Sequence, residues 1–275
     1  MACVTRFAPS PTGPLHLGHA YAAILAHDMA RAEGGQFLLR IEDIDTARSK
    51  PEWEAAILDD LRWLGLRRDG PVMRQSDRLP AYQAALARLQ ALGVTYHCTC
   101  TRGDIRAALS APQEGAVIGP DGPVYPGTCR DRGHGEGAVR LDMARAMALA
   151  DPPTFSDSGI RPGLYRHDAA AMQRDIGDIV LARRDIGTSY HLAVVVDDAA
   201  QGVTRVTRGE DLFAATPIHV LLQRLLGLPI PQYHHHRLIR DDQGKRLAKR
   251  DDARALAKYR AEGATPQDIR RMVGL

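Results

Sequence analysis

The 275-residue sequence contains little cysteine, little lysine, few aromatic residues and no long hydrophobic run. Four cysteines are too few for the disulfide framework that holds small secreted domains together. Since the start lacks a basic-then-apolar leader and no stretch reaches membrane-spanning length, we expect a cytoplasmic protein with no membrane partner. The hydrophobic share of 44% is ordinary for a globular protein, and the length allows one large domain with an insertion.

Lysine is scarce although basic residues are common, because arginine supplies almost all of the 36 basic side chains. Two of the four lysines, Lys245 and Lys249, nevertheless lie within five residues of one another. A site that needs a compact, movable ammonium group explains this pair better than solubility does. The formal net charge of +3 permits a nucleic-acid partner without requiring one.

The first 45 residues have the pattern of a strand, a helix and a second strand. Residues 3–8 are apolar and are followed by Pro9 and Pro11, residues 17–33 are typical of a helix ended by two glycines, and residues 36–41 are again apolar. Such a unit is a right-handed parallel crossover, whose ligands bind at the carboxyl ends of the strands. The turn at 9–14 and the acidic segment at 42–45 belong to that edge.

The remaining pattern indicates an α/β protein with a doubly wound, Rossmann-like parallel sheet, an insertion and a short helical tail. We expect helices at 51–65, 79–92 and 212–227, short buried strands at 177–184 and 190–196, a strand around 234–236, and one or two helices within 251–275. The predicted division is a first catalytic half at 1–93, an insertion with a metal module at 94–176, a second catalytic half at 177–240, and a mobile lysine loop with a helical tail at 241–275.

His16, Leu17, Gly18 and His19 stand where the first helix is expected to begin. A helix N-terminus offers unpaired N–H groups and the positive end of the helix dipole, which suit a phosphate. Gly18 would let a flat base approach the backbone, and His16 and His19 can donate to oxygens that gain charge in a transition state. On these four residues alone, two incidental surface histidines remain an alternative.

Three cysteines within 32 residues, Cys98, Cys100 and Cys129, indicate a metal site. Zinc takes four ligands in structural sites, so one more is needed, and ligand chemistry alone favours His97 or His134. Three unrelated buried thiols are the alternative. Cys3 lies on the first strand and is expected to be an inert buried thiol.

Five segments, in order along the chain, closely resemble the class I glutamyl-tRNA synthetase family. They are residues 6–13 (RFAPSPTG), 41–45 (IEDID), 192–198 (LAVVVDD), 208–212 (RGEDL) and 246–249 (RLAK). A full member of that family carries a further helical domain that reads the anticodon, for which the last two dozen residues leave no room. The chain is therefore expected to lack an anticodon-binding domain and is similar to the truncated paralogues, the glutamyl-Q tRNA(Asp) synthetases.

The resemblance implies a ligase that activates L-glutamate with ATP and Mg²⁺ and transfers it to the queuosine base in the anticodon of tRNA(Asp). We expect a monomer. Because catalysis of this reaction is mainly positioning and electrostatics, we expect no covalent enzyme nucleophile. The catalytic residues would be His16, His19 and Lys249. The glutamate contacts would be Arg6, Ala8, Ser10, Glu42, Tyr190 and Arg208, and the ATP contacts His16, Gly18, His19, Arg246 and Lys249.

The resemblance also favours Tyr125 as the fourth ligand of a structural zinc ion. In the lysine loop, Arg246 and Ala248 depart from the lysine and serine that are common in the family, and the loss of the serine hydroxyl is expected to slow loop closure. Two other functions fit the same sequence: a compact synthetase that charges a tRNA 3′ end, and a non-catalytic tRNA-binding relic.

Overall fold

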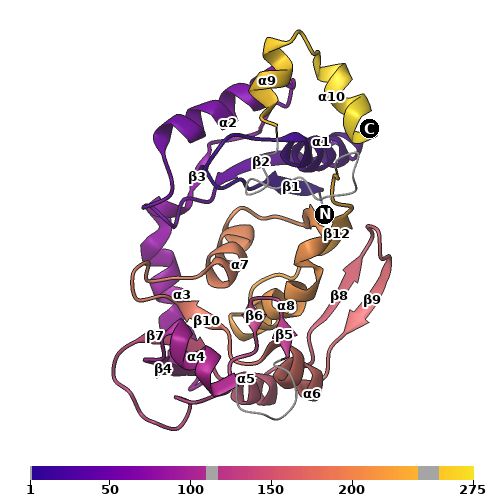
Figure 1. Ribbon diagram of the computed structural model, residues 1–275. Coiled ribbons are helices and arrows are strands. Elements are labelled where there is room, and N and C mark those ends of the chain that lie inside the picture. Colours follow the sequence, from indigo (N-terminus) through magenta and orange to yellow (C-terminus); the bar gives the residue numbers. More distant parts are fainter. Residues whose placement is uncertain (1, 110–116, 241–253) are drawn as a thin grey trace.

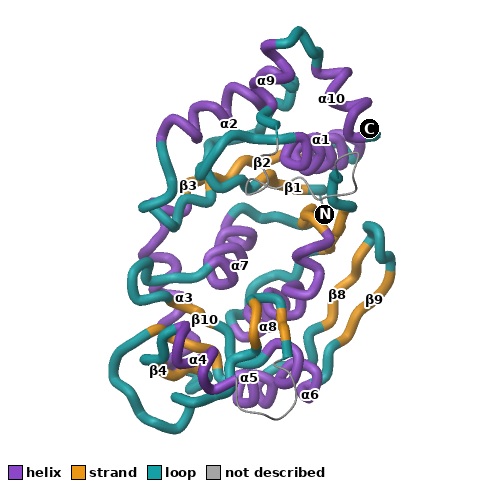
Figure 2. The backbone as a smooth tube through the Cα atoms, in the orientation of Figure 1, coloured by secondary structure: helices purple, strands orange, loops and turns teal. Residues whose placement is uncertain are grey.

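A computed structural model describes residues 2–109, 117–240 and 254–275, and its centre is a mainly parallel sheet (Figure 1). One part of the sheet has the strand order β1-β2-β3, and the other has the order β11-β12-β8-β9. The two parts meet where the backbone N–H of Thr204 donates to the carbonyl of Val4. The strands are β1 (Val4–Phe7), β2 (Gln36–Ile41), β3 (Met73–Arg74), β8 (Thr154–Asp157), β9 (Gly163–Arg166), β11 (Arg205–Gly209) and β12 (Gln232–His236). All these pairs are parallel except β8 with β9, which form a hairpin (Figure 2).

The expected strand–helix–strand unit is confirmed. Helix α1 (Leu17–Ala32) joins β1 to β2, which pair in parallel from Val4 with Gln36 onwards. Gly34 has a φ of +61° after the helix, a conformation that glycine adopts at little cost. At Gly35 a Cβ atom would lie 1.9 Å from the carbonyl oxygen of Cys3, so only glycine lets the chain turn back onto the sheet here.

One face of β1 and β2 is covered by helices from both ends of the chain (Figure 1). Side chains of α1 and β2 share a core with Ile57 and Leu61 of α2 and with Leu256 and Ile269 near the end of the chain. Other helices of the two ends of the chain are α2 (Pro51–Trp63), η1 (Gln75–Arg78), α3 (Leu79–Ala91), α9 (Leu256–Ala261) and α10 (Pro266–Val273). None of the helices in the described part of the chain is long and apolar enough to cross a membrane.

Between the two halves of the sheet, the chain builds a smaller antiparallel sheet of order β10-β7-β4. The helices and strands of this segment are short. They are β4 (Thr95–Cys98), α4 (Arg102–Leu109), β5 (Ile118–Gly119), β6 (Gly122–Pro123), β7 (Ala138–Leu141), α5 (Met143–Leu149), α6 (Ala169–Ala171), the π-helix η2 (Met172–Ile176) and β10 (Val180–Ala182). The division into units at 94, 177 and 241 stays a prediction.

The strand expected at 190–196 is wrong, because these residues begin helix α7 (Tyr190–Ala200). Ser189 caps the helix by accepting a hydrogen bond from the N–H of Leu192. Residues from His191 to Val195 are all buried, so the sequence shows no polar face, and an apolar β-branched run suggests a strand. The helix expected at 212–227 is divided into the 3₁₀-helix η3 (Glu210–Ala215) and α8 (Thr216–Leu225).

Candidate functional site

A pocket of about 610 Å³ lies at the carboxyl ends of β1, β2 and β11. It brings together every candidate glutamate or ATP residue that falls in the described part of the chain. These nine residues are Arg6, Ala8, Ser10, His16, Gly18, His19, Glu42, Tyr190 and Arg208. The other two candidates, Arg246 and Lys249, lie outside the described residues. The individual roles stay predictions, but the turn after β1 and the acidic segment after β2 do meet at this edge, as expected.

The side chains of His16 and His19 cap the N-terminus of α1, each accepting a hydrogen bond from a backbone N–H group there. The N–H of Gly18 donates to Nδ1 of His16 at 3.1 Å, and the N–H of His16 donates to Nδ1 of His19 at 3.2 Å. The two ring centroids are 3.8 Å apart. Because a neutral imidazole whose Nδ1 accepts carries its proton on Nε2, both histidines are set as Nε2–H donors beside the helix dipole.

Gly18 is required by this packing as well as by any ligand. A Cβ atom at this position would lie 3.0 Å from Cε1 of His16, which is tighter than most real contacts. A side chain here would therefore push the His16 ring away from its capping position. The sequence pattern predicted Gly18 from ligand approach alone, and the structure adds this second reason.

Arg6 is buried and already holds a carboxylate of the protein. Its Nε and Nη2 donate to Asp198 at 2.9 and 3.4 Å, and its Nη1 donates to the carbonyl of Thr207 at 3.1 Å. Burial opposes ionisation of Asp198, but the charges of Arg6 and Arg40 outweigh it and hold the pKa of that carboxyl below its usual range. The guanidinium fork that was expected to grip glutamate is thus engaged by Asp198.

Arg208 is buried among neutral partners instead. Its Nη1, Nε and Nη2 contact His219 at 2.8 Å, His235 at 3.1 Å and Thr216 at 2.8 Å. Burial, reinforced by the neighbouring Arg208 charge, lowers the pKa of His219 well below its ordinary value and that of His235 to about 4. Since neutral rings do not cancel a guanidinium charge, Arg208 is the arginine of this pocket better able to attract a carboxylate.

Glu42 supplies the negative end of the pocket. Its Oε1 accepts from Nη2 of Arg40 at 3.1 Å, and its side chain is 12% exposed. Burial raises its pKa, and the charges of Arg40 and Arg6 act against that rise. A negative group at one end and Arg208 at the other suit a ligand that carries both an ammonium and a carboxylate.

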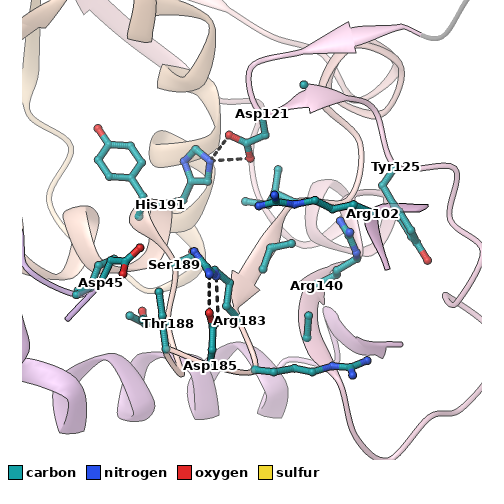
Figure 3. A pocket seen from close by; sticks show the side chains of 18 of the residues that line it. Asp45, Arg102, Asp121, Tyr125, Arg140, Arg183, Asp185, Thr188, Ser189 and His191 are labelled. Carbon is teal, nitrogen blue, oxygen red and sulfur yellow. Dashed lines mark hydrogen bonds and ion pairs between the residues drawn. The ribbon is translucent and has the colours of Figure 1, made fainter. Parts of the chain in front are cut away.

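A second, larger cleft of about 1290 Å³ adjoins the pocket, and both cavities are lined by Ser10, Thr12, Glu42 and Tyr190. Figure 3 shows the part of this cleft around Asp121, Arg102, Arg140 and Arg183. Its arginines are Arg48, Arg102, Arg106, Arg140, Arg183 and Arg184. These six arginines stand among five acids, Glu42, Asp45, Asp121, Asp178 and Asp185, and Arg48 and Arg183 pair with Asp45 and Asp185. The cleft therefore has a small excess of basic side chains beside the pocket.

The sequence interpretation missed the acids that organise the pocket. Asp197 and Asp198 are buried, and Asp197 accepts from Gln75, Arg78 and Tyr82. A signal was available, because two acids that follow a fully apolar run must find partners when the run is buried. Their partners come from residues more than 100 positions away, which no local pattern identifies.

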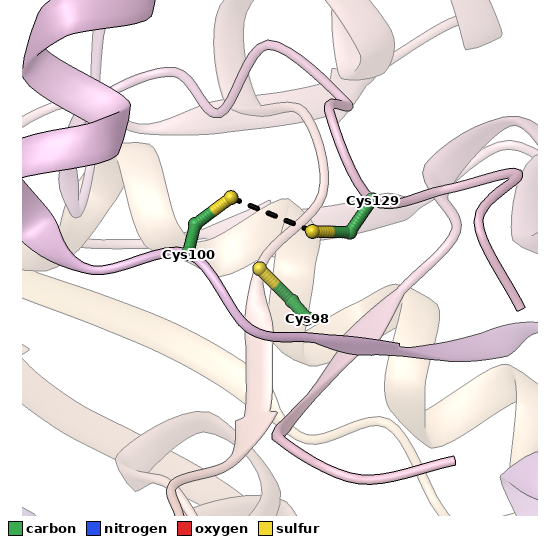
Figure 4. A group of neighbouring side chains, drawn as sticks. All are labelled: Cys98, Cys100 and Cys129. Carbon is green, nitrogen blue, oxygen red and sulfur yellow. Dashed lines mark hydrogen bonds between the residues drawn. The ribbon is translucent and has the colours of Figure 1, made fainter. Parts of the chain in front are cut away.

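The three expected metal-binding cysteines converge in the insertion (Figure 4). The sulfur atoms of Cys98, Cys100 and Cys129 lie within 4.8 Å of one another. Although burial acts against it, hydrogen bonds led by that of Tyr125 lower the pKa of Cys129 to about 5. A thiolate at neutral pH is the form that binds a metal ion, so the cluster has the chemistry of a metal site.

Tyr125 is placed better than either histidine to complete this cluster. Its hydroxyl lies 3.3 Å from Sγ of Cys98 and 3.5 Å from Sγ of Cys100. His97 precedes Cys98 on strand β4, so its side chain points to the opposite face. His134 reaches the neighbouring Thr99 instead, with Nε2 at 3.5 Å from the hydroxyl.

Comparisons with known proteins identify the fold and the family. Residues 2–275 match the family described as tRNA synthetases class I (E and Q), catalytic domain. The chain is 68% identical to the glutamyl-Q tRNA(Asp) synthetase of Rhodobacter capsulatus, over 99% of this chain and 100% of the relative. It is 46% identical to the protein of that name from Nocardia farcinica, over 96% of this chain and 81% of the relative.

Solved structures agree with this assignment. The glutamate-tRNA synthetase of Elizabethkingia anophelis superimposes with a TM-score of 0.79 and 27% identity. The match covers 100% of this chain but 61% of that one, so the chain spans less than two thirds of the longer synthetase. With its mainly parallel sheet, its insertion and its match at full length to a relative, the chain belongs to the class I tRNA synthetases for E and Q and, within them, to the glutamyl-Q tRNA(Asp) synthetases.

Proposed function

We propose that the protein is a ligase that forms glutamyl-adenylate from L-glutamate and ATP and transfers the glutamate to queuosine in tRNA(Asp). The observation that carries the proposal is the single pocket lined by all nine described candidate residues. Family membership supports it, because the relatives that match along nearly the whole chain are glutamyl-Q tRNA(Asp) synthetases.

In the first step, the α-carboxylate of glutamate attacks the α-phosphorus of ATP and pyrophosphate leaves. The Nε2–H groups of His16 and His19 and the first N–H groups of α1 would stabilise charge on the phosphate oxygens. Mg²⁺, carried in with ATP, would neutralise charge on the phosphates. Lys249 and Arg246 are proposed to add positive charge, although both lie outside the described residues.

Recognition of glutamate would use the two ends of the pocket. Glu42 would receive the α-ammonium group, and Arg208 would bind the side-chain carboxylate through its guanidinium. Arg6 would act mainly through its pair with Asp198, which fixes the pocket wall, with Ala8, Ser10 and Tyr190 as neighbouring contacts. Catalysis by these groups is positioning and electrostatics, without a covalent bond to the enzyme.

In the second step, a hydroxyl group of queuosine attacks the carbonyl carbon of the adenylate and AMP leaves. The two cavities share four lining residues, so an acceptor base in the larger cleft would reach the adenylate directly. The arginines of the cleft would bind phosphates of the anticodon loop. A monomer in the cytoplasm stays a prediction for the whole protein.

The cysteine cluster is proposed to hold a structural zinc ion through Cys98, Cys100, Cys129 and Tyr125. Four protein ligands leave no coordination position for a water molecule, so zinc would stabilise the insertion and take no part in the reaction. The three thiols and the adjacent hydroxyl fit this role.

The test is transfer of radiolabelled glutamate to tRNA(Asp) with queuosine and to the same tRNA with guanosine, with tRNA(Glu) alongside. Label on the queuosine-containing sample alone is the expected result. Label at the 3′ end of tRNA(Glu) would instead identify a compact charging synthetase. The absence of label from all samples, together with no glutamate-dependent exchange of pyrophosphate into ATP, would indicate a non-catalytic tRNA-binding protein.

A further inference from the structure

A chain of hydrogen-bonded side chains connects the larger cleft to Arg208, and the proposed reaction steps do not use it. The carboxylate of Asp121 contacts Nε2 of His191 at 2.9 and 3.0 Å. Nδ1 of His191 lies 3.0 Å from Nε2 of His219, and Nδ1 of His219 lies 2.8 Å from Nη1 of Arg208. Figure 3 shows Asp121 and His191 pointing toward one another across the cleft. We call Asp121, His191 and His219 the relay.

The proton positions along the relay follow from Arg208, which can only donate. Nδ1 of His219 must accept from Arg208, so this neutral ring carries its proton on Nε2 and donates it to His191. Nδ1 of His191 therefore accepts, and its Nε2–H points at Asp121. Every bond thus runs in one direction, from the guanidinium through two imidazoles to a carboxylate.

A second branch fixes Arg208 from the other side. Nε of Arg208 donates to Nε2 of His235, so the proton of that ring is on Nδ1 and faces the buried carboxylate of Asp157. Thr216 accepts from Nη2. The hydrogen bonds among the described residues use three of the five N–H groups of Arg208, which leaves two for a ligand in the pocket.

The members of the relay come from elements that the fold brings together only here. Asp121 is in the turn between β5 and β6, His191 follows Tyr190 on α7, and His219 is on α8. Both rings are buried, whereas the Asp121 side chain is 57% exposed in the cleft. Two buried polar rings give less stability than apolar side chains of the same volume, so packing alone does not account for them.

We propose that Asp121, His191 and His219 are positioning residues that hold Arg208 in the orientation that binds the side-chain carboxylate of glutamate. The relay holds the guanidinium of Arg208 through two neutral imidazole rings. The carboxylate of the relay, on Asp121, is at the end farthest from Arg208 and lies in the larger cleft. A carboxylate directly on Arg208, like Asp198 on Arg6, would compete with the substrate. The proposal rests on the proposed function, because it takes Arg208 as a glutamate contact.

The test uses glutamate-dependent exchange of pyrophosphate into ATP with the full chain and three variants. His191→Phe removes both bonds, and His191→Asn keeps an oxygen that can accept from His219 but cannot reach Asp121. Asp121→Asn replaces the carboxylate that accepts from His191 by a neutral amide, at a residue that is partly exposed. We expect the KM for glutamate to rise roughly 3- to 10-fold in Asp121→Asn and more in His191→Phe, with His191→Asn between wild type and His191→Phe. The KM for ATP is expected to stay within about twofold of the wild-type value.

Asp175→Asn is the matched control. Asp175 lies in the same insertion, is 51% exposed and pairs with Arg174, and no hydrogen bond or ion pair among the described residues links its side chain to Arg208 or to the relay. Unchanged glutamate KM in both Asp121→Asn and His191→Phe would overturn the proposal. So would a parallel rise of the KM values for glutamate and ATP with a lower melting temperature, because that result indicates a purely structural role. Absence of exchange in the wild-type protein would instead refute the proposed function.

Discussion

The negative charge of Asp60 destabilises the folded state. It is 6% exposed on α2, between core residues Ile57 and Leu61, and burial, together with the charge of Asp59, raises its pKa to about 6. Because this pKa is above the value of about 3.8 in the unfolded chain, the folded state binds the proton more tightly. The resulting stability is present below about pH 4 and is lost as the pH rises through 6.

Asp60→Asn is therefore expected to stabilise the protein at pH 8, by about 1–3 kcal/mol, since it removes a buried charge and keeps the shape. Urea unfolding at pH 8 and pH 4 measures the free energy of unfolding, and the gain should vanish at the lower pH. Asp59→Asn is the comparison, because Asp59 is 53% exposed and should change stability by less than about 1 kcal/mol. Equal effects of Asp60→Asn at the two pH values would contradict the assignment.

The cysteine cluster makes a second prediction at the scale of single residues. Cys129→Ser is expected to lose the bound metal, because a neutral hydroxyl replaces a thiolate among three ligands that lie within 4.8 Å. Inductively coupled plasma mass spectrometry of the purified protein measures this, with one zinc ion per chain expected in the wild type. Cys3→Ser is the control and should keep its zinc, since Cys3 lies beside β1 and outside the cluster.

Tyr125→Phe separates the possible fourth ligands. If the Tyr125 hydroxyl completes the site, this variant should lose zinc to EDTA faster than wild type, while His97→Ala and His134→Ala should not. Fast loss from a histidine variant with normal retention in Tyr125→Phe would assign the ligand to that histidine instead.

At the scale of the element, the start of α1 combines a structural task with a chemical one. His16 caps the helix through Nδ1, and its imidazole also lines the pocket. Asparagine is among the best N-cap residues, so His16→Asn is expected to keep the free energy of unfolding within about 0.5 kcal/mol of wild type. It should still reduce the rate of pyrophosphate exchange about 10- to 100-fold, because the Nε2–H donor to the phosphate is lost.

His16→Ala is the matched comparison, since it removes both the cap and the donor. It should lower exchange to a similar degree and also destabilise the protein by about 1 kcal/mol in urea unfolding. Full activity in His16→Asn would mean that His16 only caps the helix, and the proposed role of its imidazole would then be wrong.

The elements that could be predicted from the sequence are those with a clear local signal. Helix α1 has glycines after it and strands on both sides, and β1, α1 and β2 were placed to within a residue or two. Helix α7 could not be recognised, because all of its first turns are buried and the hydrophobic pattern then has no period. Burial on every side erases the signal that distinguishes a helix from a strand.

At the scale of the whole molecule, chain topology predicted where the site would lie but not how its charges are paired. Segments that follow β1, β2 and β11 meet at one edge of the sheet, which any parallel α/β fold would bring about. The pair of Arg6 with Asp198 and the relay depend instead on how α7 packs against β1 and α8. Such contacts join residues far apart in sequence, and only the folded structure fixes them.

The whole molecule also contains several buried or half-buried histidines, which affect how its free energy of unfolding depends on pH. Burial is the leading cause of a lowered pKa at five histidines: His167, His219, His234, His235 and His236. Each ring titrates near pH 6.5 in the unfolded chain, so below that pH the unfolded state binds more protons than the folded state. The stability that these residues contribute is complete above about pH 7 and is lost as the pH falls.

We therefore expect the free energy of unfolding to fall by at least about 3 kcal/mol between pH 7 and pH 5, measured by urea unfolding at each pH. Asp60 acts in the opposite direction between pH 7 and pH 5. Because its pKa is raised in the folded protein, its protonation over this range adds about 1 kcal/mol to the free energy of unfolding. In the Asp60→Asn background the loss on acidification should accordingly become steeper. A stability that stays level or rises from pH 7 to pH 5 in that background would mean that the five histidines take up protons in the folded protein, and the neutral rings on which the orientation of Arg208 depends would then be charged.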